Sequence, residues 1–177
     1  MSPGGQRLAE FTDRLVAYII DYAILTAIIS IVAVPVYLFA VFQIFGDLPT
    51  TVVVDDQVIS ADPTPDEVFG ALGMLFGVMA VILLFAAIVI YVYEVELMFK
   101  SGQTLGKRIM KIQIVPIDPA ATLTRGMATR RVLVQYGVAA FVPFFTYLDG
   151  LWQLWDKPYR QCLHDKWATT VVIKLNP

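Results

Sequence analysis

The sequence predicts an all-α integral membrane protein. We expect two long transmembrane helices, a third helix interrupted by proline, and a small β pairing on the cytoplasmic side. Of 177 residues, 58% are hydrophobic and 16% are charged, and the mean hydropathy is +0.68, which lies outside the range of soluble domains of this size. The polar stretches between the apolar runs are too short for a separate soluble core, so we expect a single membrane domain over residues 1–177.

The first predicted transmembrane helix covers residues 15–45, an apolar run that holds one charged side chain. Leu8, Phe11 and Leu15 follow helical spacing and predict a short lead-in helix at the membrane surface. At about 1.5 Å per residue the run is longer than a hydrocarbon core of about 30 Å, so the helix must tilt, bend or overrun. Pro35 is the expected bend. The run is too long for the core of a cleaved signal peptide, so we expect this helix to be retained.

An external acidic loop is expected at residues 46–64. Residues 46–67 contain six acidic side chains and no Lys or Arg, and two short β-branched runs within them favour a small hairpin. Thr64-Pro65-Asp66-Glu67 then combines a Thr cap, a proline at the first helical position and a Glu three residues after the cap. This combination predicts a helix start, and the second transmembrane helix is predicted over residues 65–100.

The second helix carries small residues along one side, a pattern that lets another helix approach closely. They recur at spacings of three and seven: Gly70, Gly73, Gly77, Ala80 and Ala87. Glu94 lies seven residues after Ala87 on the same side, so we expect its side chain to face the packed interior. Glu96 is predicted to project elsewhere.

A basic cytoplasmic loop is predicted at residues 101–131. Residues 100–131 contain seven Lys or Arg and one acid, which marks the cytoplasmic side by the positive-inside rule. The N-terminus is then cytoplasmic, and we expect a multi-pass protein of the inner (cytoplasmic) cell membrane. Residues 109–117 and 168–174 are both β-rich and are predicted to pair at this surface.

The third apolar segment, residues 132–155, contains Pro143 near its middle and Asp149 further on. A simple crossing would place the basic tail, residues 156–177, outside the cell. A re-entrant or in-plane path would keep the tail beside the basic loop. The charge distribution favours the second path, because positive residues near spans resist export.

Asp21 is the first candidate for function. A carboxylate inside a transmembrane run is costly unless it points toward a partner or a water-filled path. Arg14 lies two helical turns earlier on the same face. One hypothesis is a cation or proton site in which Asp21 binds the ion and Arg14 tunes its pKa or competes for it. The alternative is a buried anchor that Asp21 makes with another helix.

Glu94 and Asp149 are secondary candidates, because a relay or cation path needs further acids near the membrane. For Glu94 the alternative is an interfacial position at the helix end. Asp149 precedes Gly150, and for it the alternative is a cap or turn at the interface.

Other kinds of site are not expected. The segment G-Q-T-L-G-K-R at residues 102–108 has one residue too few between its glycines for a phosphate-binding loop. Cys162 is the single cysteine, which excludes an intramolecular disulfide and a cysteine-based cluster. His164 has no second His or Cys at ligand spacing, so no metal is expected. We expect neither enzyme motifs nor a cofactor, and nucleic acid is not an expected partner.

Three blocks of sequence carry a family resemblance. Residues 14–21 read R-L-V-A-Y-I-I-D, residues 102–108 read G-Q-T-L-G-K-R, and residues 163–172 read L-H-D-K-W-A-T-T-V-V. In this order they resemble the RDD family of small bacterial membrane proteins, which is named for one arginine and two aspartates. The sequence departs from the family at Thr169, where a glycine is common between Ala and Thr.

The resemblance implies that Arg14, Asp21 and Asp165 are the signature positions, and it implies a transport-like role. If Asp165 joins the region of Arg14 and Asp21, the tail returns to the cytoplasmic side of helix one. Arg14 would then bridge Asp165 and leave Asp21 deeper in the membrane. The same arrangement would serve a purely structural clasp.

The sequence therefore predicts a multi-pass membrane protein of the RDD type that transports or binds a monovalent cation or proton through its intramembrane acids. The alternative is a non-transporting membrane interaction or assembly protein whose charged residues are structural. The expected partners are the lipid bilayer and either a second copy or another membrane protein, because two or three helices enclose little aqueous path.

Overall fold

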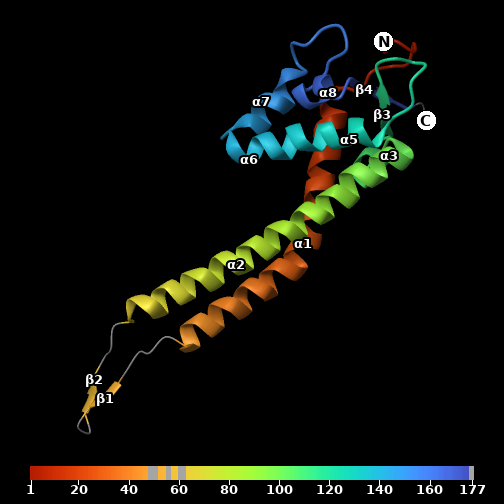
Figure 1. The fold of residues 1–177 in the computed structure, drawn as a ribbon. Coiled ribbons are helices and arrows are strands. Elements are labelled where there is room, and N and C mark those ends of the chain that lie inside the picture. Colours follow the sequence, from red (N-terminus) through yellow and green to blue (C-terminus); the bar gives the residue numbers. More distant parts are fainter. Residues whose placement is uncertain (48–51, 55–56, 60–62, 176–177) are drawn as a thin grey trace. The chain divides into compact units, whose positions relative to one another are not determined.

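The computed structural model of the chain describes residues 1–47, 52–54, 57–59 and 63–175. The described chain is mostly helical, with two small two-stranded sheets (Figure 1). Its contacts form two compact units. The terminal unit comprises Met1–Thr26 and Val89–Pro177, and the hairpin unit comprises Ala27–Ile88. Every candidate site residue predicted from the sequence lies in the terminal unit.

The first helix, α1 (Phe11–Asp47), is continuous and includes Pro35. It begins four residues before the predicted start. A bend at Pro35 stays a prediction. In the hairpin unit, β1 (Val52–Val54) pairs antiparallel with β2 (Gln57–Ile59). This pairing confirms the predicted hairpin for the described part of the acidic loop.

The second helix, α2 (Pro65–Ile90), starts at the predicted cap. The Thr64 amide donates to Glu67 Oε2 at 2.8 Å, and the Glu67 amide donates to Thr64 Oγ1 at 3.4 Å. The helix continues through a π-helical turn, η1 (Tyr91–Glu96), into α3 (Leu97–Ser101). Together these elements match the predicted span of residues 65–100.

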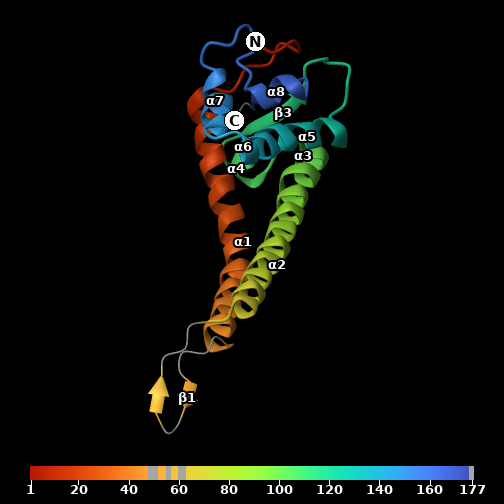
Figure 2. The same ribbon diagram turned by 60° about the vertical axis from the view of Figure 1, so that its left-hand side comes forward.

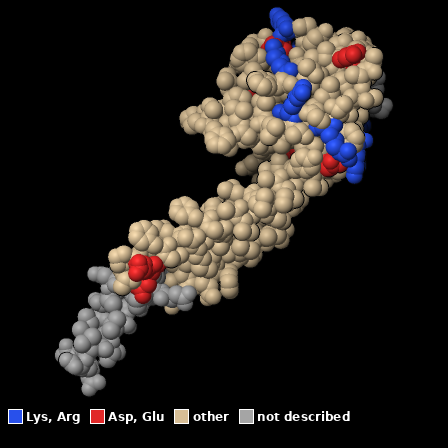
Figure 3. Space-filling view, viewed as in Figure 1, with Lys and Arg blue, Asp and Glu red and all other residues tan. Residues whose placement is uncertain are grey.

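Two helical stretches are long and apolar enough to cross a membrane, Phe11–Ile44 and Pro65–Ser101. Large apolar side chains on both are exposed, for example Ile31 at 74% and Phe76 at 73%. On the face shown in Figure 3, the helical stretch of the hairpin unit carries no charged side chains apart from acids near the start of α2. Such extended apolar surface is stable in lipid and not in water.

The small-residue side of α2 has no close neighbour among the described residues at its three glycines. A Cβ added at Gly70, Gly73 or Gly77 would meet none of the described atoms within 4 Å. Among the described residues, therefore, no helix makes the expected close approach at these glycines.

The terminal unit contains the second sheet. The strand β3 (Ile112–Pro116) pairs antiparallel with β4 (Thr170–Lys174), which confirms the predicted pairing of residues 109–117 with 168–174. The predicted lead-in helix is wrong, because Leu8 forms a bridge with Ile173 and the chain there is extended. Leu8 is 8% exposed, so its apolar side chain is buried beside the sheet instead of lying on a membrane-surface helix.

Short helices lie in the predicted basic loop, the third apolar segment and the tail, and those after residue 124 contact one another (Figure 2). They are α4 (Leu105–Ile109), α5 (Arg125–Val132), η2 (Leu133–Val138), α6 (Ala139–Phe141), α7 (Phe145–Trp152) and α8 (Leu163–Trp167). The helical run breaks beside Pro143, where Val142 is extended and Phe144 has a φ of 64°. After this break α7 packs against both η2 and α8.

Candidate functional site

Two groups of buried charged residues lie in the terminal unit. The inner cluster consists of Asp21 on α1, Glu94 on η1 and Lys107 on α4. The tail cluster consists of Arg14, Arg131, Asp149, His164 and Asp165. Burying a charge is costly unless it is paired or hydrogen-bonded, so the partners of each group determine what the group can do.

Asp21 is 2% exposed and is surrounded by donors. Its Oδ1 accepts from Tyr93 Oη at 2.6 Å and from the Gly106 amide at 2.7 Å. Its Oδ2 accepts from Thr104 Oγ1 at 2.5 Å and from Lys107 Nζ at 3.3 Å. Asp21 therefore points inward, as expected for a carboxylate in a transmembrane run. Tyr93 lies on η1, and the other three donors lie in the second family block, residues 102–108.

The two glycines of this second block allow close backbone packing. Gly102 ends α3 with a φ of 68°, and a Cβ there would lie 2.8 Å from the Ile114 carbonyl oxygen. A Cβ at Gly106 would overlap the Ala17 carbonyl oxygen and lie 2.9 Å from the carboxyl carbon of Asp21. Only glycine lets α4 lie against the backbone of α1 at this point.

Glu94 is also 2% exposed, as the sequence predicted. Its Oε1 accepts from Tyr136 Oη at 3.4 Å. Its Oε2 lies 3.6 Å from Lys107 Nζ and receives no hydrogen bond from the described residues. Glu96 projects elsewhere, also as predicted, and pairs with Arg125 at 2.9 Å. π-Helical turns often occur at functional sites, and here one places Glu94 beside Lys107.

Arg14 pairs with Asp165 and not with Asp21, so no direct contact supports the hypothesis in which Arg14 acts on the Asp21 site. Its NH1 donates to Asp165 Oδ2 at 2.9 Å, and Arg131 NH1 donates to Asp165 Oδ1. The reason is distance, because Arg14 and Asp21 are two helical turns apart whereas β4 and α8 bring Asp165 beside Arg14. The cation next to Asp21 is Lys107. The bridge between Arg14 and Asp165 that the family resemblance implied is present.

Asp165 is fully buried, and its environment favours the charged form. Burial alone would raise its pKa, but Arg131, His164 and Arg14 together hold the pKa of this carboxyl well below its usual range. The Cys162 amide also donates to it, at 3.0 Å. Asp165 is therefore a permanent anion that holds two arginines, and it is unsuited to exchanging a proton near neutral pH.

Asp149 is buried and connects α7 to α8. Its Oδ1 accepts from the His164 amide at 2.9 Å, and its Oδ2 lies 2.6 Å from His164 Nδ1. His164 Nε2 lies 3.5 Å from Asp165 Oδ1. Asp149 thus accepts a free amide at the start of α8, which is a capping contact, and also contacts the imidazole ring of His164.

Three side chains of α8 and its cap could be considered as metal ligands. Atoms of Cys162, His164 and Asp165 lie within 4.8 Å of one another. Burial, however, raises the pKa of the Cys162 thiol and disfavours the thiolate that binds metals. Asp165 already holds two guanidinium groups, Arg14 and Arg131, which would repel a divalent cation. These residues fit an ion-pair network better than a metal site.

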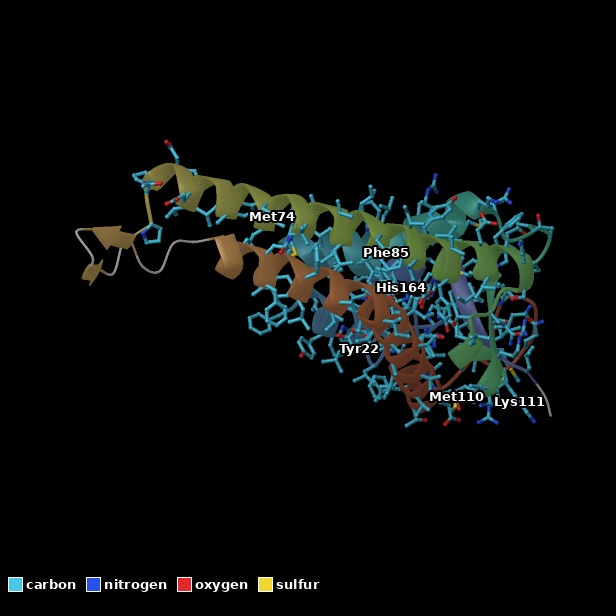
Figure 4. The ribbon with its side chains drawn as sticks, turned by 90° about the horizontal axis from the view of Figure 1, so that it is seen from below. Tyr22, Met74, Phe85, Met110, Lys111 and His164 are labelled. Carbon is cyan, nitrogen blue, oxygen red and sulfur yellow. The ribbon has the colours of Figure 1, made fainter. Side chains whose placement is uncertain are left out.

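A cavity of about 630 Å³ adjoins both clusters. It lies between α1, α4, η2, α7 and α8, and Tyr22 on its wall projects outward from α1 (Figure 4). The charged or titratable side chains on its wall include Arg14, Lys107, Arg131, Asp149, His164 and Asp165. Lys107 both lines this cavity and forms ion pairs with Asp21 and Glu94.

The profile of the RDD family matches residues 8–169, which is most of the chain. The chain belongs to the RDD family. Among curated proteins and among solved structures, none matches it. Family membership and the two candidate spans together describe an RDD-family membrane protein in a lipid bilayer. The matched range contains the three signature residues and both charged clusters.

Several residues of these clusters could not be found from the sequence alone. The segment that contains Thr104, Gly106 and Lys107 matches a family block and lacks the spacing of a phosphate-binding loop, but nothing in it indicates contact with Asp21. Arg131 contributes to the cytoplasmic charge, and its position directly before an apolar run is the one signal of its burial. For Tyr93, the one signal of a role in the cluster is its position next to Glu94 in the sequence.

Proposed function

We propose that this RDD-family protein exchanges a proton or a monovalent cation at its inner cluster, with Glu94 as the exchanging group. One observation supports this most directly. Two buried carboxylates share one ammonium group, and Glu94 Oε2 has no hydrogen bond from the described residues.

The charge of the inner cluster explains why this arrangement suits exchange. If Asp21, Glu94 and Lys107 are all ionised, the cluster has a net charge of −1 in a region shielded from water. An uncompensated buried charge is costly, and one proton or one monovalent cation removes the excess. Asp21 has four donors and stays satisfied. Glu94 is less completely paired, so it is the group where the added charge binds.

We also infer that the third apolar segment returns to the side of the membrane from which it started. The pairing of β3 with β4 supports this path, because β3 precedes the segment and β4 comes after it. A single crossing would separate the two strands across the bilayer. The positive-inside rule assigns this side to the cytoplasm.

The transport proposal is tested with purified protein in proteoliposomes loaded with a pH-sensitive dye. Wild-type protein should give a pH change driven by a monovalent cation gradient, and Glu94→Gln should abolish it. Glu96→Gln is the matched control, because it makes the same charge change on the same helical turn at a group paired outside the cluster. Asp21→Asn should also abolish flux. If the wild-type protein shows no cation-dependent flux, transport is excluded.

A structural role for the charges is the second candidate, and it belongs with a non-transporting interaction or assembly protein. The observation that favours it is the set of four donors around Asp21, which resembles an anchor between α1 and α4. It predicts a wild-type protein without flux, in which Asp21→Asn loses its fold and Glu94→Gln keeps it. Thermal unfolding in detergent separates this outcome from transport.

A further inference from the structure

The Lys107 ammonium group occupies a site built from oxygen atoms. Its Nζ lies 3.0 Å from Thr104 Oγ1, 3.3 Å from Asp21 Oδ2 and 3.6 Å from Glu94 Oε2. Thr104, Asp21 and Glu94 are each nearly or fully buried. Protein oxygens that replace water around a dehydrated ion are the usual means of binding small monovalent cations.

We infer that Lys107 is a tethered cation and that the three oxygens form a binding site for a small monovalent cation that replaces it. The inference rests on the proposed function and identifies the atoms of its site. The chain thus carries its own substitute for the ion, held on a flexible four-carbon stem.

The neighbouring cavity gives the displaced lysine a place to go. Lys107 lines the cavity of about 630 Å³ and is 15% exposed at its side chain. Its stem can rotate so that the ammonium group leaves the three oxygens and enters the cavity. The same cavity then provides a path by which a small cation reaches the vacated site.

Charge determines how the site responds once the lysine has left. Without the ammonium group, Asp21 and Glu94 would leave two negative charges close together in a buried place, which is strongly unfavourable. A small cation between them restores the original net charge. A bulky cation is excluded because the oxygens accommodate only an ammonium-sized group, so the site should distinguish K⁺, Na⁺ and methylammonium from larger organic cations.

The test removes the tethered cation and supplies a free one. In Lys107→Ala, the thermal unfolding midpoint in detergent should rise by roughly 2–6 °C as methylammonium or KCl is added, because a ligand that binds only the folded state stabilises it. N-methylglucamine chloride at equal concentration controls for ionic strength and should have no such effect. Wild type should respond much less, because Lys107 competes with the added cation for the site. Lys100→Ala, which removes an exposed lysine on α3, should behave like wild type.

Two further variants make the result decisive. Lys107→Ala combined with Glu94→Gln removes one acid and should lose most of the response. Lys107→Met keeps the length of the lysine stem and replaces Lys107→Ala in the test if the alanine variant folds poorly. Its thermal unfolding midpoint should rise when small cations are added. Equal responses to N-methylglucamine, or variants that stay unstable in methylammonium, would overturn the inference.

The outcomes also separate this inference from the proposed function, because the assay measures stability and not flux. Rescue of Lys107→Ala together with a wild-type protein that shows no flux would leave a cation site without transport. Flux in the wild type without rescue of Lys107→Ala would mean that exchange uses other groups.

Discussion

At the residue scale, the backbone conformation of Thr169 explains why glycine is common at this position in the family. Its φ is 53°, in the left-handed region that β-branched side chains rarely adopt. The turn is held by the Thr169 amide, which donates to the Lys166 carbonyl at 3.1 Å, and by the Ile117 amide, which donates to the Thr169 carbonyl at 3.0 Å. The RDD family commonly has glycine here, and the structure explains that preference, since glycine has no Cβ to strain the turn.

Replacing Thr169 with glycine should therefore stabilise the protein. Relief of the left-handed strain outweighs the extra entropy of glycine in the unfolded chain, so we expect a net gain of about 1 kcal/mol. Thermal unfolding in detergent measures it. Thr169→Ala is the control, because it removes the hydroxyl but keeps the Cβ and should gain less. Equal gains for alanine and glycine would contradict this explanation.

The charged residues show how far sequence reasoning reaches at this scale. Asp21 and Glu94 are predicted as candidates because an acid in or beside an apolar run needs a partner, Asp165 is implied by the family resemblance, and all three are buried. Their partners could not be predicted. Lys107 lies 86 residues after Asp21, and Arg131 meets Asp165 through the packing of α5 against α8. Spacing along one helix places Arg14 and Asp21 on the same face, whereas folding pairs Arg14 with Asp165 of the tail.

At the element scale, the short helix α4 determines the inner cluster. It has five residues, too few to be stable alone in water, so its position depends on contact with α1. Gly106 makes that contact by bringing its backbone against Ala17 and donating its amide to Asp21. Thr104 and Lys107 on either side are then directed at the same carboxylate.

Gly106→Ala should separate α4 from α1. The added methyl group would overlap the Ala17 carbonyl and crowd Asp21, so the helix must move and the hydrogen bond from the residue 106 amide is weakened. We expect a loss of about 2–3 kcal/mol in unfolding free energy, measured by thermal unfolding in detergent.

The matched control is Gly126→Ala on α5. There the nearest atom to an added Cβ, Thr124 Oγ1, lies 3.8 Å away, an ordinary contact, and alanine favours helix by up to about 1 kcal/mol. This variant should be neutral or slightly more stable. Similar destabilisation in both variants would show that the helices tolerate no alanine in general, and the specific contact of Gly106 would lose its support.

At the scale of the whole molecule, the sheet links the two ends of the chain. The bridge of Leu8 with Ile173 and the pairing of β3 with β4 bring the start, the middle and the tail together in the terminal unit. Lys and Arg gather over this unit on the face shown in Figure 3. Because a bilayer would separate strands that are hydrogen-bonded in this way, the proposed topology places them on one side.

Cysteine labelling tests this topology. In a Cys162→Ser background, Gln6→Cys and Leu175→Cys should react with a membrane-impermeant thiol reagent from the same side. Pro63→Cys, just before α2, should react from the opposite side. Residue 175 labelled from the side opposite to residue 6 would mean that the third apolar segment crosses the membrane.

The sequence by itself determined the membrane class, the presence of the two long helices, the cap at Thr64, the strand pairing and the acids that need partners. These features depend on composition, local periodicity and neighbouring residues, which a linear chain displays directly. Only the tertiary structure decided that Lys107 is the partner of Asp21 and Glu94, that two arginines hold Asp165, and that a cavity adjoins both clusters. These contacts join residues far apart in the chain, and they form only where glycine-mediated backbone packing and strand pairing bring distant segments within a few ångströms.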